Sequence, residues 1–185
     1  AAYETVRKTD FFGYELCLLY VIWSYENLEK YAESVVYREK LLVFRKKYKG
    51  KDHKDYVQAL NGLALNYFRQ GNYVKSLEFN KKTLSVRENL IGINHKDYLT
   101  SLNQIARDYN YLGDHKKSLE YNFRLLNLYE NQLGKQDTTY AERLVYIARD
   151  YANLRDYNKA LEYGLEALDI YEALVGKEHS SYALV

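Results

Sequence analysis

The sequence has no proline and no methionine, and it has a single cysteine, Cys17. One cysteine can form neither an internal disulfide nor a thiolate metal cage, and the chain also has no Asn-x-Ser/Thr acceptor for glycosylation. These absences favour a cytoplasmic location. The longest largely apolar stretch, residues 11–23, is interrupted by Gly13 and Glu15 and is too short to cross a bilayer, so no membrane partner is expected.

A strong excess of charge of one sign is also missing. The chain has 27 basic and 25 acidic residues, a formal net charge of +2. It therefore lacks the electrostatic field that attracts nucleic acids or acidic membrane surfaces. Hydrophobic residues make up 47% of the chain, which is enough for a core and too many for a disordered segment. The composition predicts a folded protein for which nucleic acid is an unlikely partner.

What the chain contains instead is a repeat. The stretch GKDHKDY at residues 50–56 recurs in divergent form, with its glycine at positions 50, 92, 134 and 176 and therefore every 42 residues. A fixed period of roughly 20 to 50 residues indicates stacked structural repeats. The sequence predicts a lead-in segment at residues 1–13, repeats at 14–55, 56–97, 98–139 and 140–181, and the start of a fifth repeat at 182–185.

The first half of each repeat has the pattern of an amphipathic helix. Apolar residues fall at positions i, i+3, i+4 and i+7, which form one stripe on a helix. The columns hold Leu18, Val21, Ile22 and Tyr25; Leu60, Leu63, Ala64 and Tyr67; Leu102, Ile105, Ala106 and Tyr109; and Leu144, Ile147, Ala148 and Tyr151. The tyrosine column is expected in the core.

Capping residues and glycines predict where the helices begin and end. The expected N-caps of the first helices are Asp55, Asp97, Thr139 and Ser181. Thr139 and Glu142 have the spacing of a capping box. Gly71 and Gly113 suit the turn inside a hairpin, after which Asn72, Asp114 and Asp156 are expected to cap the second helices. No segment predicts a strand, so the expected fold is all-α, an α-solenoid of tandem antiparallel helical hairpins.

These columns resemble the tetratricopeptide repeat. The period of 42 residues is similar to that of the kinesin-light-chain-like subclass, whose Leu-Asn-Asn-Leu-Ala helix start has counterparts at residues 60–64 and 102–106. The proline of that subclass's loop is replaced by Lys54, Lys96, Thr138 and Ser180. The resemblance covers about residues 14–185 and implies a right-handed superhelix with a concave, non-catalytic binding groove.

Few residues suggest reaction chemistry. His53, His95 and His179 share one loop column, and stacked hairpins would hold them about 10 Å apart, too far to share a metal ion. Cys17 shares a column with Ala59, Ser101 and Arg143, which predicts a mostly buried, inert thiol. Phosphate-binding loops and hydrolase motifs are absent from the sequence. We expect no enzymatic activity, no cofactor and no metal.

The resemblance places the candidate binding site in the groove lined by the first helices. Its columns hold Asn61, Leu65, Phe68, Arg69, Asn103, Arg107, Asn110, Tyr111, Arg149 and Asn153. Amide side chains suit the backbone of an extended peptide, while Arg107 and Arg149 could hold carboxylates. Alternatively, these arginines pair with Asp108, Asp150 or other nearby acids. Tyr111 and Tyr146 are further candidates for partner contact.

The predicted function is a non-catalytic scaffold that binds a protein or extended peptide, with acidic groups or a C-terminal carboxylate on the partner. One alternative is a sensory or recruitment module of a larger enzyme or transcription regulator, and another is an RNA-binding helical repeat. Leu16, Leu19 and Trp23 make the first helix apolar nearly all round, so we expect it to be covered by residues 1–12, a preceding repeat or a partner. Self-association through uncapped ends is one way to cover it.

Overall fold

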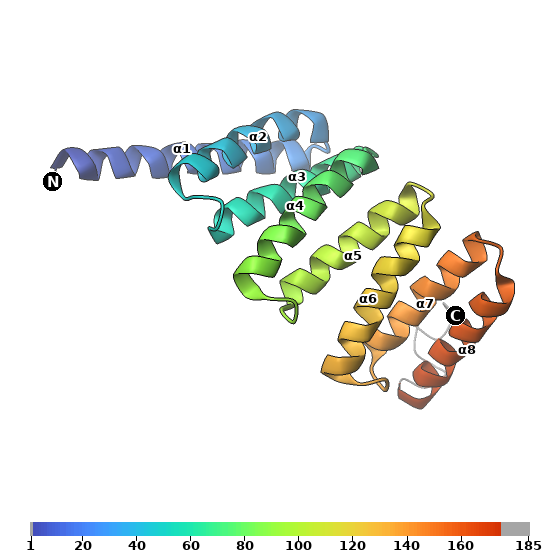
Figure 1. The fold of residues 1–185 in the computed structure, drawn as a ribbon. Coiled ribbons are helices and arrows are strands. Elements are labelled where there is room, and N and C mark those ends of the chain that lie inside the picture. The colour runs from blue at the N-terminus through green and yellow to red at the C-terminus, as the bar shows by residue number, and fades with distance from the viewer. Residues whose placement is uncertain (1, 175–185) are drawn as a thin grey trace. The chain divides into compact units, whose positions relative to one another are not determined.

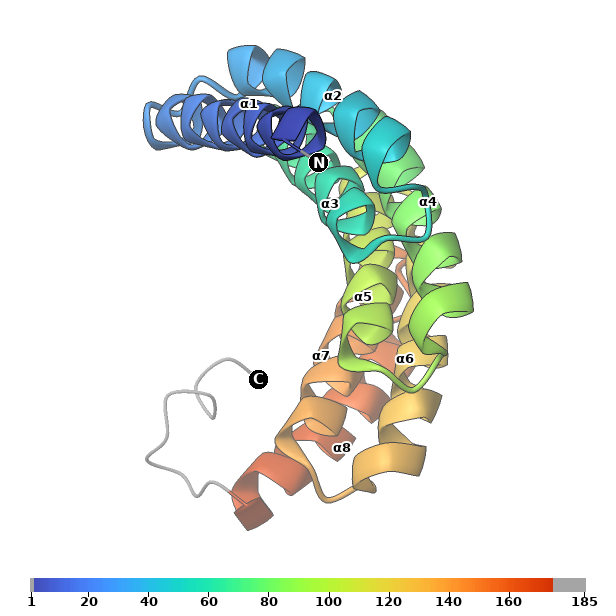
Figure 2. The ribbon, with the colours of Figure 1, turned by 90° about the vertical axis from the view of Figure 1, so that its left-hand side faces the viewer.

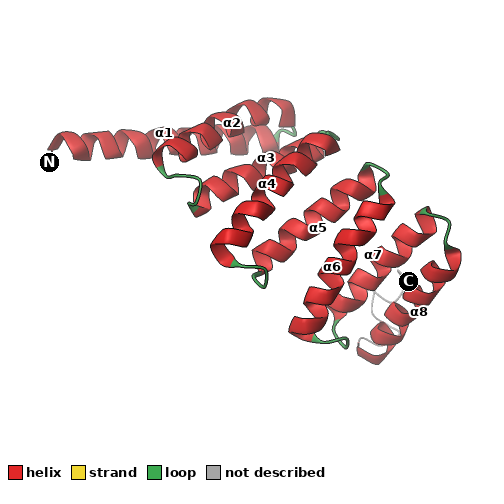
Figure 3. Ribbon diagram, viewed as in Figure 1, coloured by secondary structure: helices red, strands yellow, loops and turns green. Residues whose placement is uncertain are grey.

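The computed structural model describes residues 2–174, in which all regular structure is α-helical (Figures 1 and 3). The helices are α1 (Ala2–Asn27), α2 (Tyr31–Tyr48), α3 (Lys54–Arg69), α4 (Tyr73–Ile91), α5 (Lys96–Tyr111), α6 (His115–Leu133), α7 (Thr138–Asn153) and α8 (Tyr157–Leu174). The predicted all-α class and the sequential antiparallel hairpins are confirmed. The repeat loop at residues 176–182 and the predicted fifth repeat lie outside the described residues.

The chain divides into two compact units, unit 1 (Ala1–Leu90) and unit 2 (Ile91–Val185). In unit 1, α1 and α3 lie on the same side of α2, and in unit 2, α5 and α7 lie on the same side of α6 (Figure 2). Helix α1 begins at Ala2 and runs without interruption to Asn27, so most of the predicted lead-in segment is helical. None of the helices within the described residues is long and apolar enough to cross a membrane.

The first helices of the hairpins begin earlier than the sequence predicted. His53 and His95 are the N-caps of α3 and α5, and each accepts a hydrogen bond at Nδ1 from the backbone N–H two residues later, at 3.2 and 3.1 Å. Asp137 caps α7 in the same way through Oδ1, at 2.7 Å. The prediction of caps at Asp55, Asp97 and Thr139 was wrong, as was the capping box at Thr139. A ring nitrogen of histidine lies close enough to its own backbone to replace the carboxylate of aspartate.

The second helices begin as predicted. The side chains of Asn72, Asp114 and Asp156 each accept a hydrogen bond from the N–H three residues later, at 3.2, 3.2 and 3.3 Å. The turn before each cap needs a left-handed residue, and Gly71 and Gly113 supply φ angles of 74° and 76°. At the matching positions of the first and last hairpins, Glu29 and Arg155 have φ angles of 56° and 63°.

An aromatic pair joins the two helices of every described hairpin. The predicted core tyrosine column stacks on an aromatic ring of the second helix, with centroid separations of 5.5 to 5.6 Å. The pairs are Tyr25–Tyr37, Tyr67–Phe79, Tyr109–Tyr121 and Tyr151–Tyr163. Tyr67 and Tyr109 are buried, and the other two tyrosines of the column are half-buried. The stacks place the two helices of each hairpin in the same register.

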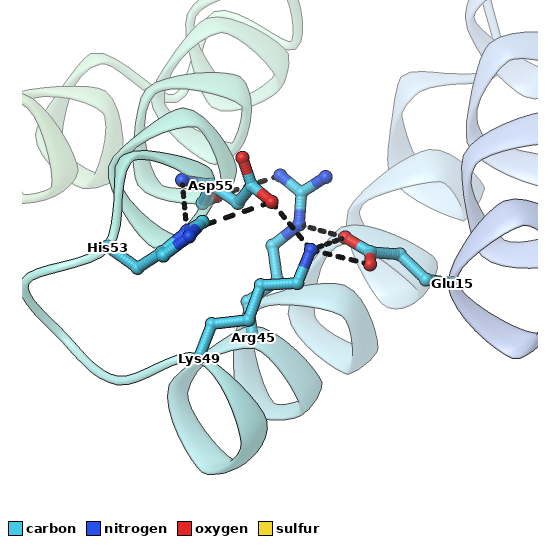
Figure 4. A network of polar contacts seen from close by, with 5 residues as sticks. All are labelled: Glu15, Arg45, Lys49, His53 and Asp55. Carbon is cyan, nitrogen blue, oxygen red and sulfur yellow. Dashed lines mark hydrogen bonds and ion pairs between the residues drawn. The ribbon is translucent and has the colours of Figure 1, made fainter. Parts of the chain in front are cut away.

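A charged network joins the three helices of unit 1 that surround the first repeat loop (Figure 4). Glu15 of α1 accepts hydrogen bonds from Arg45 Nε at 2.8 Å and from Lys49 Nζ at 2.7 Å. Lys49 Nζ also lies 2.5 Å from Asp55 Oδ2, and Arg45 Nη1 donates to the Asp55 carbonyl oxygen at 2.8 Å. Because Glu15 and Arg45 are buried, neither charge could remain there without the other.

Candidate functional site

A polar pocket of about 250 Å³ lies among α5, α6 and α7 in unit 2. Its lining is dominated by arginine, amide and tyrosine side chains: Asn103, Ala106, Arg107, Tyr111, Ser118, Asn122, Arg143, Tyr146 and Arg149. Four of these residues, Asn103, Arg107, Tyr111 and Arg149, belong to the groove predicted from the sequence. The structure therefore brings the two predicted carboxylate-binding arginines to one pocket.

Arg143 is the cation held most tightly in this pocket. Its side chain is 3% exposed, and its Nη1 donates to Asn103 Oδ1 at 2.8 Å and to Asn122 Oδ1 at 3.3 Å. Its Nη2 lies 4.0 Å from a carboxylate oxygen of Glu142, and its buried Nε–H has no hydrogen-bond partner among the described residues. Burial lowers the pKa of Arg143, and the nearby Glu142 opposes that shift. The pocket thus holds a cation whose donors are only partly used.

Asp150 lies beneath the pocket, fully buried, and is bound mainly by neutral groups. It accepts hydrogen bonds from Asn110 Nδ2 at 2.7 Å, Ser118 Oγ at 2.6 Å and Asn122 Nδ2 at 2.8 Å. Asn122 connects the two charges, because its amide group donates to Asp150 and its oxygen accepts from Arg143. Asp150 therefore fixes the amide that orients Arg143, while the pocket surface is left to the arginines.

Arg149 differs from the alternative in which it would pair with a neighbouring acid. Among the described residues it makes no ion pair, and its guanidinium carbon lies 4.7 Å from the centroid of the Tyr146 ring. The guanidinium carbon of Arg143 lies 4.2 Å from the same centroid. Stacking on an aromatic ring holds a guanidinium in place without using its N–H donors. Tyr146, a suggested contact residue, therefore serves to position both arginines.

The remaining predicted groove residues are arranged differently. Asn110 is occupied by Asp150 and does not line the pocket, and Asn153 is exposed outside it. In unit 1, Phe68 packs on the ring of Tyr73 and Arg69 lies over the ring of Tyr31. Asn61 and Leu65 of the same helix, α3, are half-buried. The role of all these residues in partner binding stays a prediction.

Arg143 was not among the predicted site residues, although the sequence contains a signal for it. Its column holds Cys17, Ala59 and Ser101 in the other repeats, so a long cation replaces three small residues. Such a replacement at a packed position needs space and polar partners, which the pocket provides. The same column misled the prediction for Cys17, which is exposed and not buried. No described helix covers α1 on the side where α2 covers α3.

The other chemistry-bearing residues have structural contacts. His53 and His95 are helix caps, and His115 Nδ1 lies 3.7 Å from Asp150 Oδ1. Among the described residues, no three His, Cys, Asp or Glu side chains form a group that could hold a metal ion. A larger pocket of about 750 Å³ lies between α1 and α2 and has a mostly apolar lining that includes Phe11, Tyr14 and Phe44. It contains none of the predicted groove residues.

The comparisons with known proteins agree with this architecture. Residues 24–89, 55–131 and 97–173 match the family model described as tetratricopeptide repeat. No sequence among the curated proteins matches the chain. Among solved structures, the Podosopora anserina putative kinesin light chain with nearly identical TPR-like repeats is 17% identical, with a TM-score of 0.77, and the match covers 91% of this chain and 80% of that one.

Two further structures have the same fold. BtubC (BKLC) from P. vanneervenii is 15% identical over 86% of this chain and 64% of its own, with a TM-score of 0.73. A Rap protein complexed with competence and sporulation factor is 16% identical over 95% of this chain and 51% of its own, with a TM-score of 0.60. At these identities the likeness concerns the fold alone. Together with the family-model matches between residues 24 and 173, the helical hairpins establish that this chain belongs to the tetratricopeptide repeat family.

Proposed function

We propose that this chain is a non-catalytic scaffold and that the unit 2 pocket binds carboxylate groups of an extended, acidic peptide segment of a protein partner. The observation that carries the proposal is the buried Arg143, whose Nε–H has no partner among the described residues, beside Arg107 and Arg149 in one pocket. A buried cation with unused donors is costly, and a carboxylate would supply both the charge and the acceptors.

The lining also suits the backbone of a peptide. Exposed Asn103 can accept and donate hydrogen bonds beside Arg143, and Tyr111 is 55% exposed at the pocket wall. Tyrosine provides contact area at a low cost in conformational entropy. Tetratricopeptide repeats commonly bind proteins, and the similar Rap protein was solved as a complex with competence and sporulation factor. These likenesses support a binding role and leave the ligand chemistry to the pocket itself.

Selection of phage-displayed random peptides on the immobilised chain tests the proposal. We expect enrichment of aspartate and glutamate, and loss of that enrichment when the selection is repeated on the double variant Arg107→Ala/Arg149→Ala. Binding of one selected peptide, followed by fluorescence anisotropy, should weaken roughly tenfold for Arg149→Ala, because a hydrogen bond to a charged group contributes about 1.5–3 kcal/mol. Replacing the peptide's aspartates by asparagine should have a comparable effect.

The matched control is Lys116→Ala/Lys135→Ala, which removes the same number of positive charges from unit 2 outside the pocket. It should leave the affinity within about twofold, since remote exposed charges are screened by salt. Enrichment of neutral peptides, or equal binding by the arginine variant and wild type, would show that the pocket does not recognise carboxylates.

A further inference from the structure

One face of α1 is exposed where the other first helices are covered. Cys17, Tyr20 and Ser24 are exposed, whereas the same columns in α3 hold the buried residues Ala59, Gly62 and Asn66. In α3 that face is covered by α2, as shown by the hydrogen bond of 2.7 Å from Asn66 to Ser34 and by the position of Arg38 over Gly62. In α7 it is covered by α6, through the bonds of Arg143 and Asp150 to Asn122.

One face of α8 is exposed where the other second helices are covered. Leu161 is 63% exposed and Leu165 is 49% exposed. The residue of α6 in the Leu161 column is Leu119, which is 8% exposed and belongs to the core cluster formed with Leu144 and Ile147 of α7. In α2 the same column holds Val35, which packs against α3. The exposed faces of α8 and α1 are thus the two halves of an interface that the chain builds twice internally.

The shapes of these two faces are complementary at one pair of columns. Inside unit 1 this pair is Arg38 and Gly62, so a long side chain lies over a residue without one. Inside unit 2 the pair is Asn122 and Tyr146, which both line the pocket. On the two exposed faces the pair is Gly164 of α8 and Tyr20 of α1. A Cβ atom at Gly164 would meet nothing within 4 Å, so the packing of this chain alone does not require glycine there.

The polar groups of the two faces are complementary as well. Inside unit 2, Asp150 needs the hydroxyl of Ser118. The residue of α1 in the Asp150 column is Ser24, whose hydroxyl already donates to the Tyr20 carbonyl oxygen at 2.8 Å. The residue of α8 in the Ser118 column is Ala160, which has no hydroxyl to satisfy. Joining α1 to α8 would therefore bury no charge in this column.

We propose that the chain associates with itself head to tail, with α1 of one copy packed on α8 of the next. In this interface Tyr20 covers Gly164, and Leu161 and Leu165 become buried. A second copy is the occupant because the two faces repeat, column for column, the α2–α3 and α6–α7 interfaces of the chain itself. Such a contact is heterologous and does not close on itself, so assemblies grow beyond the dimer as the concentration rises. The proposal is independent of the carboxylate pocket.

Sedimentation velocity over a wide range of protein concentrations tests this arrangement. The mean mass of the wild-type chain should rise past that of a dimer, whereas Tyr20→Glu and Gly164→Arg should each remain monomeric. An equimolar mixture of the two variants should form a dimer and nothing larger, because one variant keeps an intact α8 face and the other an intact α1 face. The control Val74→Glu changes an exposed residue of α4 outside both faces and should assemble like wild type.

The single thiol gives an independent measurement. Cys17 lies on the α1 face, so its reaction with a thiol reagent should slow severalfold as the wild-type concentration rises and should remain fast in Tyr20→Glu. Far-ultraviolet circular dichroism verifies that the variants are folded. A wild-type chain that stays monomeric throughout, or assembly that survives both substitutions, would overturn the proposal. A mixture of variants that fails to dimerise while wild type assembles would overturn the head-to-tail geometry.

Discussion

At the scale of single residues, the turn inside each hairpin shows a strained position. Arg155 has a φ of 63°, where the matching residue of the preceding hairpin is Gly113 with a φ of 76°. A left-handed conformation costs a residue with a Cβ about 1–2 kcal/mol, part of which glycine offsets by its larger entropy when unfolded. We expect Arg155→Gly to raise the free energy of unfolding by about 0.5–1 kcal/mol, measured by urea denaturation.

The reciprocal change checks the cause. Gly113→Ala places a Cβ where nothing lies within 4 Å, so any destabilisation arises from the backbone and not from a clash. It should lower the free energy of unfolding by about 1 kcal/mol. If both changes were neutral, strain at this column would be too small to matter.

The sequence identified these turn positions but not every residue of the candidate site. The glycines at 71 and 113 mark the turn because only the backbone decides there. Arg107 and Arg149 were found by their column, whereas Arg143 depends on where Asn103, Asn122 and Tyr146 come together. That convergence of α5, α6 and α7 is a tertiary property, and no single helix pattern contains it.

At the scale of the helices, the imidazole caps are a separate source of stability. His95→Ala removes the acceptor of the Asp97 N–H and should lower the free energy of unfolding by about 0.5–1 kcal/mol. His95→Asp restores an acceptor of the kind that Asp137 provides for α7 and should recover the loss. Thermal denaturation of the two variants beside wild type makes the comparison. Equal loss in both variants would mean that the ring packs rather than caps.

The charged network of α1, α2 and α3 predicts a dependence of stability on pH. Burial raises the pKa of Glu15, but hydrogen bonds from Lys49 and Arg45 outweigh it and hold the pKa below the ordinary value of 4.5. The pKa of Asp55 is likewise raised by burial and more strongly lowered by Lys49, to below 3.8. Since both folded-state values lie below the unfolded ones, this stability is complete above pH 4.5 and is lost as the pH falls through the folded pKa values.

Glu15→Gln tests this network. At neutral pH it leaves the buried Arg45 without its carboxylate and should lower the free energy of unfolding by about 2–3 kcal/mol. The variant should also lose less stability than wild type between neutral and acidic pH, as measured by urea denaturation across that range. An unchanged pH profile would place the acid sensitivity elsewhere.

The helices themselves were predictable, and their starts were not. The apolar stripe with a tyrosine every 42 residues led directly to the hairpins and to the aromatic stacks within them. The first helices begin earlier than expected because histidine is not among the usual N-caps, so the nearest Asp or Thr was chosen instead. Asn72, Asp114 and Asp156 were correct because they follow a turn and have the common capping chemistry.

At the scale of the whole molecule, a repeat chain is stabilised mainly through neighbouring hairpins. Leu144→Ala deletes a fully buried side chain of α7 and should cost about 2–5 kcal/mol. Hydrogen exchange should then increase first in residues 91–174, while the amides of α1 and α2 keep most of their protection. Leu133→Ala, at a residue that is 50% exposed, is the matched control and should change little. Uniform loss of protection along the chain would contradict this local response.

The period of the sequence predicted which elements follow one another, but not which faces they leave open. Column reasoning assumes that each helix has a neighbour on both sides, and it therefore placed Cys17 in the interior. The structure leaves Cys17 exposed because no described helix covers that side of α1. Exposure depends on neighbours in space, which a column of residues in one sequence does not contain.

The exposed Trp23 of α1 has an optical consequence. It is the only tryptophan among 22 tyrosines and 6 phenylalanines, and it is 63% exposed. Its emission therefore reports the polarity around one helix, while tyrosine emission sums over stacked rings in every hairpin. Selective excitation of the indole separates events at α1 from unfolding of the remaining chain, so the protein carries its own site-specific fluorophore without labelling.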